Sequence, residues 1–336
     1  MKRLIKLLVI PCLVAVMALW LLHSLNQPLQ QSSPLRIAIN PWPGFADAFV
    51  AAEKGLFTKN GVTVQLVMQS EQRLSNRTYK DGDSDGLFAP LSDVIVLATQ
   101  GVLSKTVYVV DYSQSGDVIV ARPGVTSLAD LKGGSISIDS VHSFSHIYVL
   151  RALQSHGVDE NEVRFEIITA PRVLTALEQG LIDAGHTWQP TSSRAIAKGY
   201  HIISKAGDFP GIITDVLSFT AQTVADRPKD VAAVVKSLLE ARIYVEQHRE
   251  EAVAIMAKAT GMSEQEVSDG LSEIIRPDLR GNLTAFSRFK STLSLYQSGS
   301  YITDFLLDRG FVRHVPRIDD LVDPKIINTL SSDRPS

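Results

Sequence analysis

Aromatic residues in a stiff turn form the most distinctive pattern in this sequence. The stretch NPWPGF places Trp42 between two prolines and adds Phe45, directly after an apolar run at residues 35–39. Proline fixes φ and glycine permits a turn, so this backbone would hold the aromatic pair rigidly. Two interpretations stay open at this point. Trp42 either fills the core, as aromatic residues usually do, or forms one wall of a binding site.

Small polar residues follow other predicted strands. Ser92 precedes a helix in PLSDV, Ser113 follows a strand in VVDYS, and Ser143 opens a helix in SVHSFSH. Each of these serines also has a plain structural role available, as a helix cap or in a turn. The free N–H groups and the dipole at the start of the last helix would favour an anion or a carboxylate. Trp188 and Gln189 end a strand in HTWQP, where the amide offers both a donor and an acceptor.

Motifs for metal binding and catalysis are weak or absent in the sequence. His142 and His146 stand four residues apart and His186 lies elsewhere; three histidines can bind zinc, but no further ligand pattern accompanies them. The sequence has no GxSxG, HExxH or GxGxxG motif. We therefore expect no metal, no cofactor and no enzymatic chemistry.

The composition excludes further classes. The formal net charge is −3, with 45% hydrophobic and 21% charged residues, which is ordinary for a globular protein. No stripe of Lys and Arg with interleaved aromatics indicates a nucleic-acid partner. Cys12 is the only cysteine. Because it lies in the N-terminal segment, the rest of the chain has neither a disulfide nor a thiolate site.

The N-terminus has the layout of a targeting segment. MKRLIK is basic, and residues 7–22 carry no charge. No small-x-small cleavage site follows, so residues 1–34 are interpreted as a signal peptide or as an uncleaved anchor in the cytoplasmic membrane, with a linker. In either case the basic residues stay inside and the body is periplasmic or otherwise extracytoplasmic.

Strand and helix patterns alternate from residue 35 to about residue 220. Ser127 and Asp130 stand at capping-box spacing, for example, and Gly133 ends that short helix. From Asp226 onward nearly all of the sequence is helical in pattern. The βα spacing predicts an α/β fold with mostly parallel sheets covered by helices on both faces, followed by C-terminal helices.

The order and spacing of several segments resemble the periplasmic solute-binding proteins of ABC importers, in the group for nitrate, sulfonates, taurine and thiamine-pyrimidine precursors. The segments are NPWPGF, EKGLFTKNGVTVQLV, DGLFAPLSDVI, VVDYSQSGDVIVARPGVTSLADLKGGSISI and ITAPRVLTALEQGLIDAGHTWQP. The resemblance implies a type II periplasmic-binding-protein fold of two lobes with the ligand between them. Lobe one would comprise residues 35–112 and 219–336, and lobe two residues 113–218. The chain would cross between lobes near VVDYSQSGD and ITDVLSFTA.

The resemblance also implies a function. The chain would capture a small polar solute, anionic or zwitterionic, by lobe closure and deliver it to an ABC permease. Trp42 and Phe45 would face the cleft, because open α/β sheets bind ligands at the carboxyl ends of their strands. Relatives often carry Glu where this chain has Gln189, which puts in doubt a ligand cation that needs that carboxylate. Two alternatives stay open: a membrane-anchored sensor that signals to a partner, and an enzyme similar to the pyrimidine-precursor synthases, which use a Cys-rich segment absent here.

Overall fold

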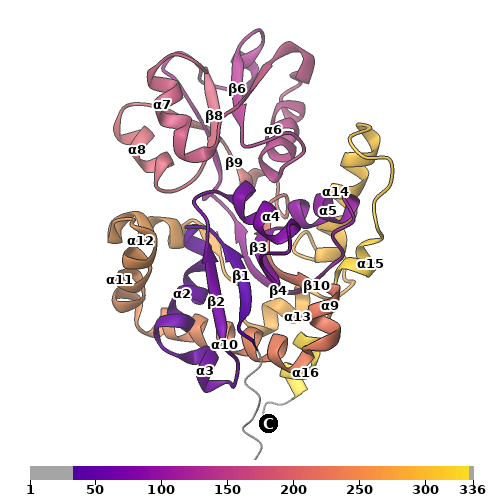
Figure 1. The fold of residues 1–336 in the computed structure, drawn as a ribbon. Coiled ribbons are helices and arrows are strands. Elements are labelled where there is room, and N and C mark those ends of the chain that lie inside the picture. Colours follow the sequence, from indigo (N-terminus) through magenta and orange to yellow (C-terminus); the bar gives the residue numbers. More distant parts are fainter. Residues whose placement is uncertain (1–32, 333–336) are drawn as a thin grey trace, which may run out of the picture. The chain divides into compact units, whose positions relative to one another are not determined.

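A computed structural model describes residues 33–332 of the chain. The predicted signal peptide or anchor falls almost wholly outside these residues. From Leu35 onward the structure contains two mixed β-sheets, each covered by helices (Figure 1). The predicted α/β class is therefore confirmed.

The first sheet has six strands in the order β11-β4-β10-β3-β1-β2. Strand β1 pairs in parallel with β2 and β3, and the pairs β3–β10, β10–β4 and β4–β11 are antiparallel. The strands are β1 (Leu35–Ile39), β2 (Val64–Met68), β3 (Gly86–Pro90), β4 (Ser104–Ser113), β10 (Thr214–Thr220) and β11 (Ile274–Ile275).

The second sheet has five strands in the order β7-β6-β8-β5-β9. Strand β6 is parallel to β7 and β8, whereas β5 is antiparallel to β8 and β9. The strands are β5 (Val118–Ala121), β6 (Ser135–Ile138), β7 (Arg164–Ile167), β8 (Ala184–Thr187) and β9 (His201–Lys205). Both sheets are thus more antiparallel than the βα spacing predicts, because the strands next to the crossings run against their neighbours.

The chain passes between the sheets twice. It leaves the first sheet after Ser113 and enters the second at Val118, and it returns between Lys205 and Thr214. The first passage falls within the predicted segment VVDYSQSGD, whereas the second lies just before the predicted segment ITDVLSFTA, which forms β10. All of β10 belongs to the first sheet, although the expected lobe boundary falls inside it. The division into two lobes at residues 112/113 and 218/219 stays a prediction.

Helices cover the faces of both sheets. Those in the first part of the chain are η1 (Pro43–Phe45), α2 (Ala46–Glu53), α3 (Leu56–Lys59), α4 (Gln72–Lys80) and α5 (Leu91–Thr99). The second sheet is accompanied by η2 (Leu128–Leu131), α6 (Phe144–Ser155), η3 (Glu160–Glu162), η4 (Ala170–Arg172), α7 (Val173–Glu178), α8 (Thr191–Ala197) and η5 (Ala206–Asp208). The capping box of Ser127 and Asp130 is present at η2.

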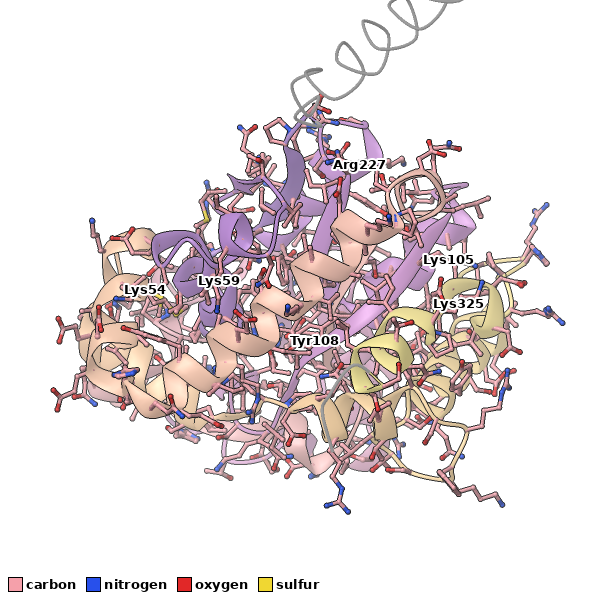
Figure 2. The ribbon with its side chains drawn as sticks, turned by 90° about the horizontal axis from the view of Figure 1, so that it is seen from below. Lys54, Lys59, Lys105, Tyr108, Arg227 and Lys325 are labelled. Atoms are coloured by element: carbon pink, nitrogen blue, oxygen red, sulfur yellow. The ribbon has the colours of Figure 1, made fainter. Side chains whose placement is uncertain are left out.

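The C-terminal third is helical, as the sequence predicts. Its helices are α9 (Ala221–Asp226), α10 (Pro228–Gln247), α11 (Arg249–Thr260), α12 (Glu264–Ser272), α13 (Leu279–Ala285), α14 (Leu295–Asp308), α15 (Ile318–Leu321) and α16 (Lys325–Ser332). Figure 2 shows α10 crossing the face of the first sheet that is turned away from the second sheet. Its buried stripe includes Val231, Val234 and Leu238, which pack into the core. Within residues 33–332, no helix is both long enough and apolar enough to cross a membrane.

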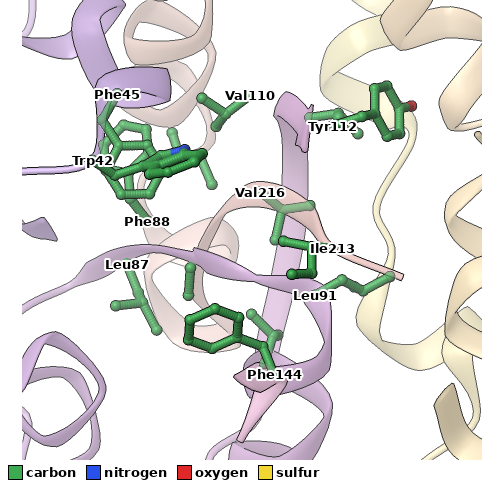
Figure 3. Close-up of a cluster of buried hydrophobic side chains, with 14 of the residues drawn as sticks. Trp42, Phe45, Leu87, Phe88, Leu91, Val110, Tyr112, Phe144, Ile213 and Val216 are labelled. Atoms are coloured by element: carbon green, nitrogen blue, oxygen red, sulfur yellow. The ribbon is translucent and has the colours of Figure 1, made fainter. Parts of the chain in front are cut away.

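The hydrophobic core fills the space between sheets and helices. Ile37, Leu87 and Val109 on the strands of the first sheet are fully buried. Figure 3 shows a cluster at the upper end of this core, in which Phe45 and Phe88 pack with ring centroids 5.1 Å apart. The core therefore continues from the first sheet to the strand ends that face the second sheet.

Candidate functional site

A small cavity lies where the ends of the two sheets meet. Its volume is about 20 Å³, which is room for about one water molecule. The lining residues come from the loops after β1, β3 and β8, from the first turns of α4 and α6, and from both crossings between the sheets. They are Asn40, Trp42, Phe45, Gln72, Pro90, Asp117, Phe144, Trp188, Ile213 and Asp215. This is the edge at which open α/β sheets bind their ligands.

Aromatic rings from both sheets form the walls of this cavity. Trp42 follows β1 and Trp188 follows β8, and their rings meet edge to face with centroids 6.4 Å apart. Phe144, at the start of α6, packs on Trp188 at 5.7 Å. Trp42 is only 5% exposed and belongs to the core cluster while it lines the cavity. Trp42 is therefore a core residue that also lines the cavity, and its contact with a ligand stays a prediction.

The backbone around Trp42 is built to fit its ring. The indole Nε1 donates to Asp111 Oδ2 at 3.1 Å. A Cβ on Gly44 would lie 1.9 Å from that carboxylate oxygen, and a Cβ on Gly116 would lie 2.7 Å from the far edge of the indole. Both positions consequently need glycine, and the ring is fixed between the turn and the first crossing.

Two aspartates face each other beside this ring. Asp215 on β10 stands opposite Asp111 on β4 in the antiparallel pairing. Burial raises the pKa of Asp111 to about 7 and holds the pKa of Asp215 well above its usual range, a shift to which Asp111 adds by repulsion. Two ionised carboxylates in this position would repel, so the pair stores a proton.

A third carboxylate comes from the first crossing. Asp117 lines the cavity, and its Oδ1 lies 3.0 Å from His186 Nε2. The other ring nitrogen of His186 lies 2.8 Å from Ser145 Oγ. His186 is thus held between a carboxylate and a hydroxyl, and it does not line the cavity.

Amide side chains complete the lining on the first-sheet side. Asn40 Nδ2 donates to Gln72 Oε1 at 3.0 Å. Gln72 Nε2 in turn donates to Phe88 O and to Asn76 Oδ1, at 3.2 and 2.9 Å. The Oδ1 atom of Asn40 is buried and has no hydrogen-bond partner among the described residues. It is therefore an acceptor left over for the cavity.

The start of α6 is already capped by a carboxylate from the first-sheet side. Phe144 N donates to Asp93 Oδ1 at 2.8 Å, and Asn76 Nδ2 donates to Asp93 Oδ2 at 2.7 Å. Burial raises the pKa of Asp93 to about 7. Asp93 lies inside α5 and caps the start of α6 rather than its own helix. The predicted anion position at α6 is consequently filled by the protein itself.

The structure brings three of the seven predicted site residues to the cavity: Trp42, Phe45 and Trp188. The serines lie elsewhere. Ser92 is buried, Ser113 Oγ accepts from Asp117 N at 2.9 Å, and Ser143 caps α6 through His146 N. The contacts of Ser113 and Ser143 are the plain structural roles, whereas Ser92 Oγ has no hydrogen-bond partner among the described residues. Ligand contact by all seven residues stays a prediction.

Gln189 bridges the two sheets next to the cavity. Its Nε2 donates to Glu273 Oε1 at 3.0 Å, and Glu273 lies between α12 and β11. Burial raises the pKa of Glu273 to about 7. Glu273 thus places a carboxyl group beside Gln189 from the first-sheet side.

Sequence reasoning missed several lining residues. Asp215 could have been found, because a charged residue inside the apolar stretch of residues 212–219 indicates a specific structural or binding role. Asn40 directly follows the first strand, so its position also pointed to the strand ends. Gln72 and Phe144 gave no signal, since nothing in their local pattern distinguishes them from ordinary helix residues. Among the described residues, no cluster of three His, Cys, Asp or Glu is arranged to hold a metal ion.

The fold is that of the type II periplasmic binding proteins. Structural comparison agrees: the periplasmic aliphatic sulphonate binding protein SsuA from Escherichia coli superposes with a TM-score of 0.70, 18% identity, and coverage of 85% of this chain and 96% of that chain. The periplasmic nitrate-binding protein NrtA from Synechocystis PCC 6803 superposes with a TM-score of 0.73 and 12% identity, over 91% of this chain and 90% of that chain. At these identities the likeness shows the fold alone.

Sequence comparison supplies the family. A family model described as NMT1-like matches residues 29–261, so the chain belongs to the NMT1-like family. A protein of Escherichia coli (strain K12) named for the binding of aliphatic sulfonates is 28% identical over 151 residues, which is 43% of this chain. The chain spans about half of that relative's length, 45%. The predicted resemblance is confirmed, and these named relatives are binding proteins rather than enzymes.

Proposed function

We propose that this chain binds a small polar solute outside the cytoplasmic membrane and delivers it to the permease of an ABC importer. One observation carries the proposal: a single cavity is lined by residues of both sheets and of both crossings, with Trp42 and Trp188 facing each other across it. Family membership and the binding proteins among the relatives support it. A protein of this kind catalyses no reaction at the cavity.

Hydrogen bonds across the cleft support a mechanism by lobe closure. Phe144 N binds Asp93, Gln189 binds Glu273, and Arg194 on α8 pairs with Glu266 on α12 at 2.8 Å. Because the closed cavity has room for about one water molecule, a solute enters only when these bonds open. Solute contacts from both lobes then exist together only after closure, so binding shifts the population toward the closed form.

The charges of the residues that line the cavity indicate which class of solute it can bind. An anionic or zwitterionic solute is the expectation from the resemblance, and the named relatives bind sulfonates and nitrate. The described lining residues include two carboxyl groups, Asp117 and Asp215, and no Lys, Arg or His. This arrangement supports a solute with a positively charged or N–H-donating end, which a zwitterion has and a simple anion lacks.

A thermal-shift screen tests the proposed function. A solute that binds the folded state raises the melting temperature in proportion to its concentration over Kd. The screen should cover anions, sulfonates, zwitterions and amines, with the full-length chain. We expect at least one class to raise the melting temperature in a concentration-dependent way. A flat response across all classes would contradict solute binding.

A further inference from the structure

The polar atoms left for a ligand in the cavity are acceptors. Asn40 Oδ1 is buried without a partner among the described residues, and Asn40 lines the cavity. Asp117 and Asp215 add carboxyl groups to the same lining. A ligand that satisfies these atoms must present N–H or O–H groups to them.

The orientation of Asn40 is fixed by a chain of hydrogen bonds. A backbone carbonyl only accepts, so the bond to Phe88 O requires the nitrogen of Gln72 on that side. The oxygen of Gln72 then faces Asn40, which must turn its own nitrogen toward it. The oxygen of Asn40 is consequently the atom that remains for the cavity.

Several of the donors around the cavity are already in use. Trp42 Nε1 donates to Asp111, and Phe144 N donates to Asp93. Both hydrogens of Gln72 Nε2 are taken by Phe88 O and Asn76 Oδ1. An anion in this cavity would therefore meet carboxyl groups and find few N–H groups to bind it.

Basic side chains are engaged elsewhere. Arg276 pairs with the buried Asp47 at 2.6 Å. Figure 2 shows Lys54, Lys59 and Lys105 on the face of the first sheet that α10 crosses, away from the second sheet. None of these cations is among the lining residues. Asp117 has His186 beside it at 3.0 Å, but no lining residue is basic, so a cationic ligand fits these carboxyl groups.

From this donor and acceptor balance, we propose that the solute is a small organic ammonium ion. Its N–H groups bind Asn40 Oδ1, Asp215 and Asp117, and its carbon skeleton lies against Trp42 and Trp188, whose ring faces also attract a cation. The inference rests on the proposed function and names the substrate class of that same site.

Matched pairs of solutes test this proposal by calorimetry with the full-length chain in a neutral detergent. The probes are n-propylammonium against 1-propanesulfonate, and benzylammonium against phenylmethanesulfonate. We expect at least one ammonium ion to bind, and its matched sulfonate to bind at least about tenfold more weakly, since an uncompensated buried carboxylate disfavours an anion.

Variants assign the effect to the cavity. Asp215→Asn keeps the side-chain shape but removes the carboxyl group with which an ammonium ion would pair, and should weaken ammonium binding about tenfold or more. Asn40→Leu removes the free acceptor and should also weaken it, which keeps the test decisive if Asp215→Asn does not fold. Asp139→Asn is the matched control, because Asp139 is buried but does not line the cavity, and should bind as the parent chain does.

The outcomes separate the two claims. If a sulfonate binds more tightly than its matched ammonium ion, the ammonium proposal is overturned while the proposed function stands. Ammonium binding that Asp215→Asn and Asn40→Leu leave unchanged also overturns it. If no ammonium ion binds but another solute raises the melting temperature, the ammonium proposal alone fails. If no solute of any class does so, both claims fail.

Discussion

At the scale of single residues, the hydrogen bonds that the side chains already make determine which polar atoms remain for a ligand. Trp42 Nε1, the only hydrogen-bond donor of that side chain, donates to Asp111. Asp93 accepts a hydrogen bond from Phe144 N at the start of α6. The open question of the sequence, whether Trp42 is core or site, has a physical answer. The ring of Trp42 packs against the core on one side and borders the cavity on the other.

Trp188 is the better residue for testing the aromatic wall, because it is less buried than Trp42. Trp188→Ala should leave the chain folded and weaken solute binding by about 2 kcal/mol, or about thirtyfold in Kd, through the lost apolar contact. Titration calorimetry measures the change. Phe289→Ala removes an aromatic that is 78% exposed and serves as the control. Equal affinities for Trp188→Ala and the parent chain would remove Trp188 from the site.

The buried carboxyl groups predict how stability depends on pH. Burial raises the pKa of Asp93, Asp111 and Glu273 to about 7, and Asp215 shifts further in the same direction. The unfolded chain has carboxyl pKa values of about 4. The folded state therefore holds these protons more tightly, and stability falls as the pH rises through about 7.

The measurement is thermal unfolding between pH 6.5 and 8, without added solute. The pKa of His146 is lowered to about 4 by burial, which opposes the trend only below pH 6.5. In the chosen window we expect the melting temperature to fall by about 2 °C or more. The charges that face Asp111 are Asp215, Asp117 and Arg276. A melting temperature that rises over this window would show that the carboxyl groups are ionised in the folded protein.

At the scale of elements, helix α12 positions the aromatic turn. Gly270 on α12 packs against the ring of Pro43, and a Cβ there would lie 2.4 Å from Pro43 Cγ. The helix thus supports the turn that carries Trp42, and Glu273 just beyond it reaches Gln189. Nothing in the helical pattern of residues 264–272 indicated this contact.

Gly270→Ala tests that support. Alanine is the better helix former by about 1 kcal/mol, so a loss of stability must come from the collision with Pro43. We expect destabilisation of about 1–3 kcal/mol in chemical unfolding, together with weaker solute binding. Ser268→Ala, two residues earlier on the same helix, should do neither. An increase in stability for Gly270→Ala would show that α12 moves freely relative to the turn.

Local rules were sufficient for most of the elements and insufficient for the site. Strand alternation, caps and βα spacing gave the strands of the second sheet, three strands of the first sheet (β1, β2 and β4), the capping box at Ser127 and the helical C-terminal third, but not β3, β10 or β11. The hydrogen-bond partners across the cleft could not be predicted, because they are far apart in the sequence. Asp93 caps a helix 51 residues away, and Glu273 lies 84 residues from Gln189. Such contacts depend on how the two sheets meet, which no local pattern encodes.

At the scale of the whole molecule, the account requires two arrangements of the sheets. The closed arrangement has cross-cleft bonds and almost no free volume, whereas a solute must enter an open one. Both passages of the chain are short, from Ser113 to Val118 and from Lys205 to Thr214. A few residues in each passage suffice to absorb the change in backbone angles.

The distance across the cleft tests this claim most directly. This distance can be measured between spin labels attached to Ala197→Cys in α8 and Glu264→Cys in α12, since both positions are exposed. The substitution Cys12→Ser removes the natural cysteine, so that only these two positions are labelled. We predict a broad or long distance distribution without solute that becomes short and narrow with a bound solute, n-propylammonium being the first to test. With Trp188→Ala the same change should need about thirtyfold more solute. A distance that stays the same at saturating solute would contradict capture by closure.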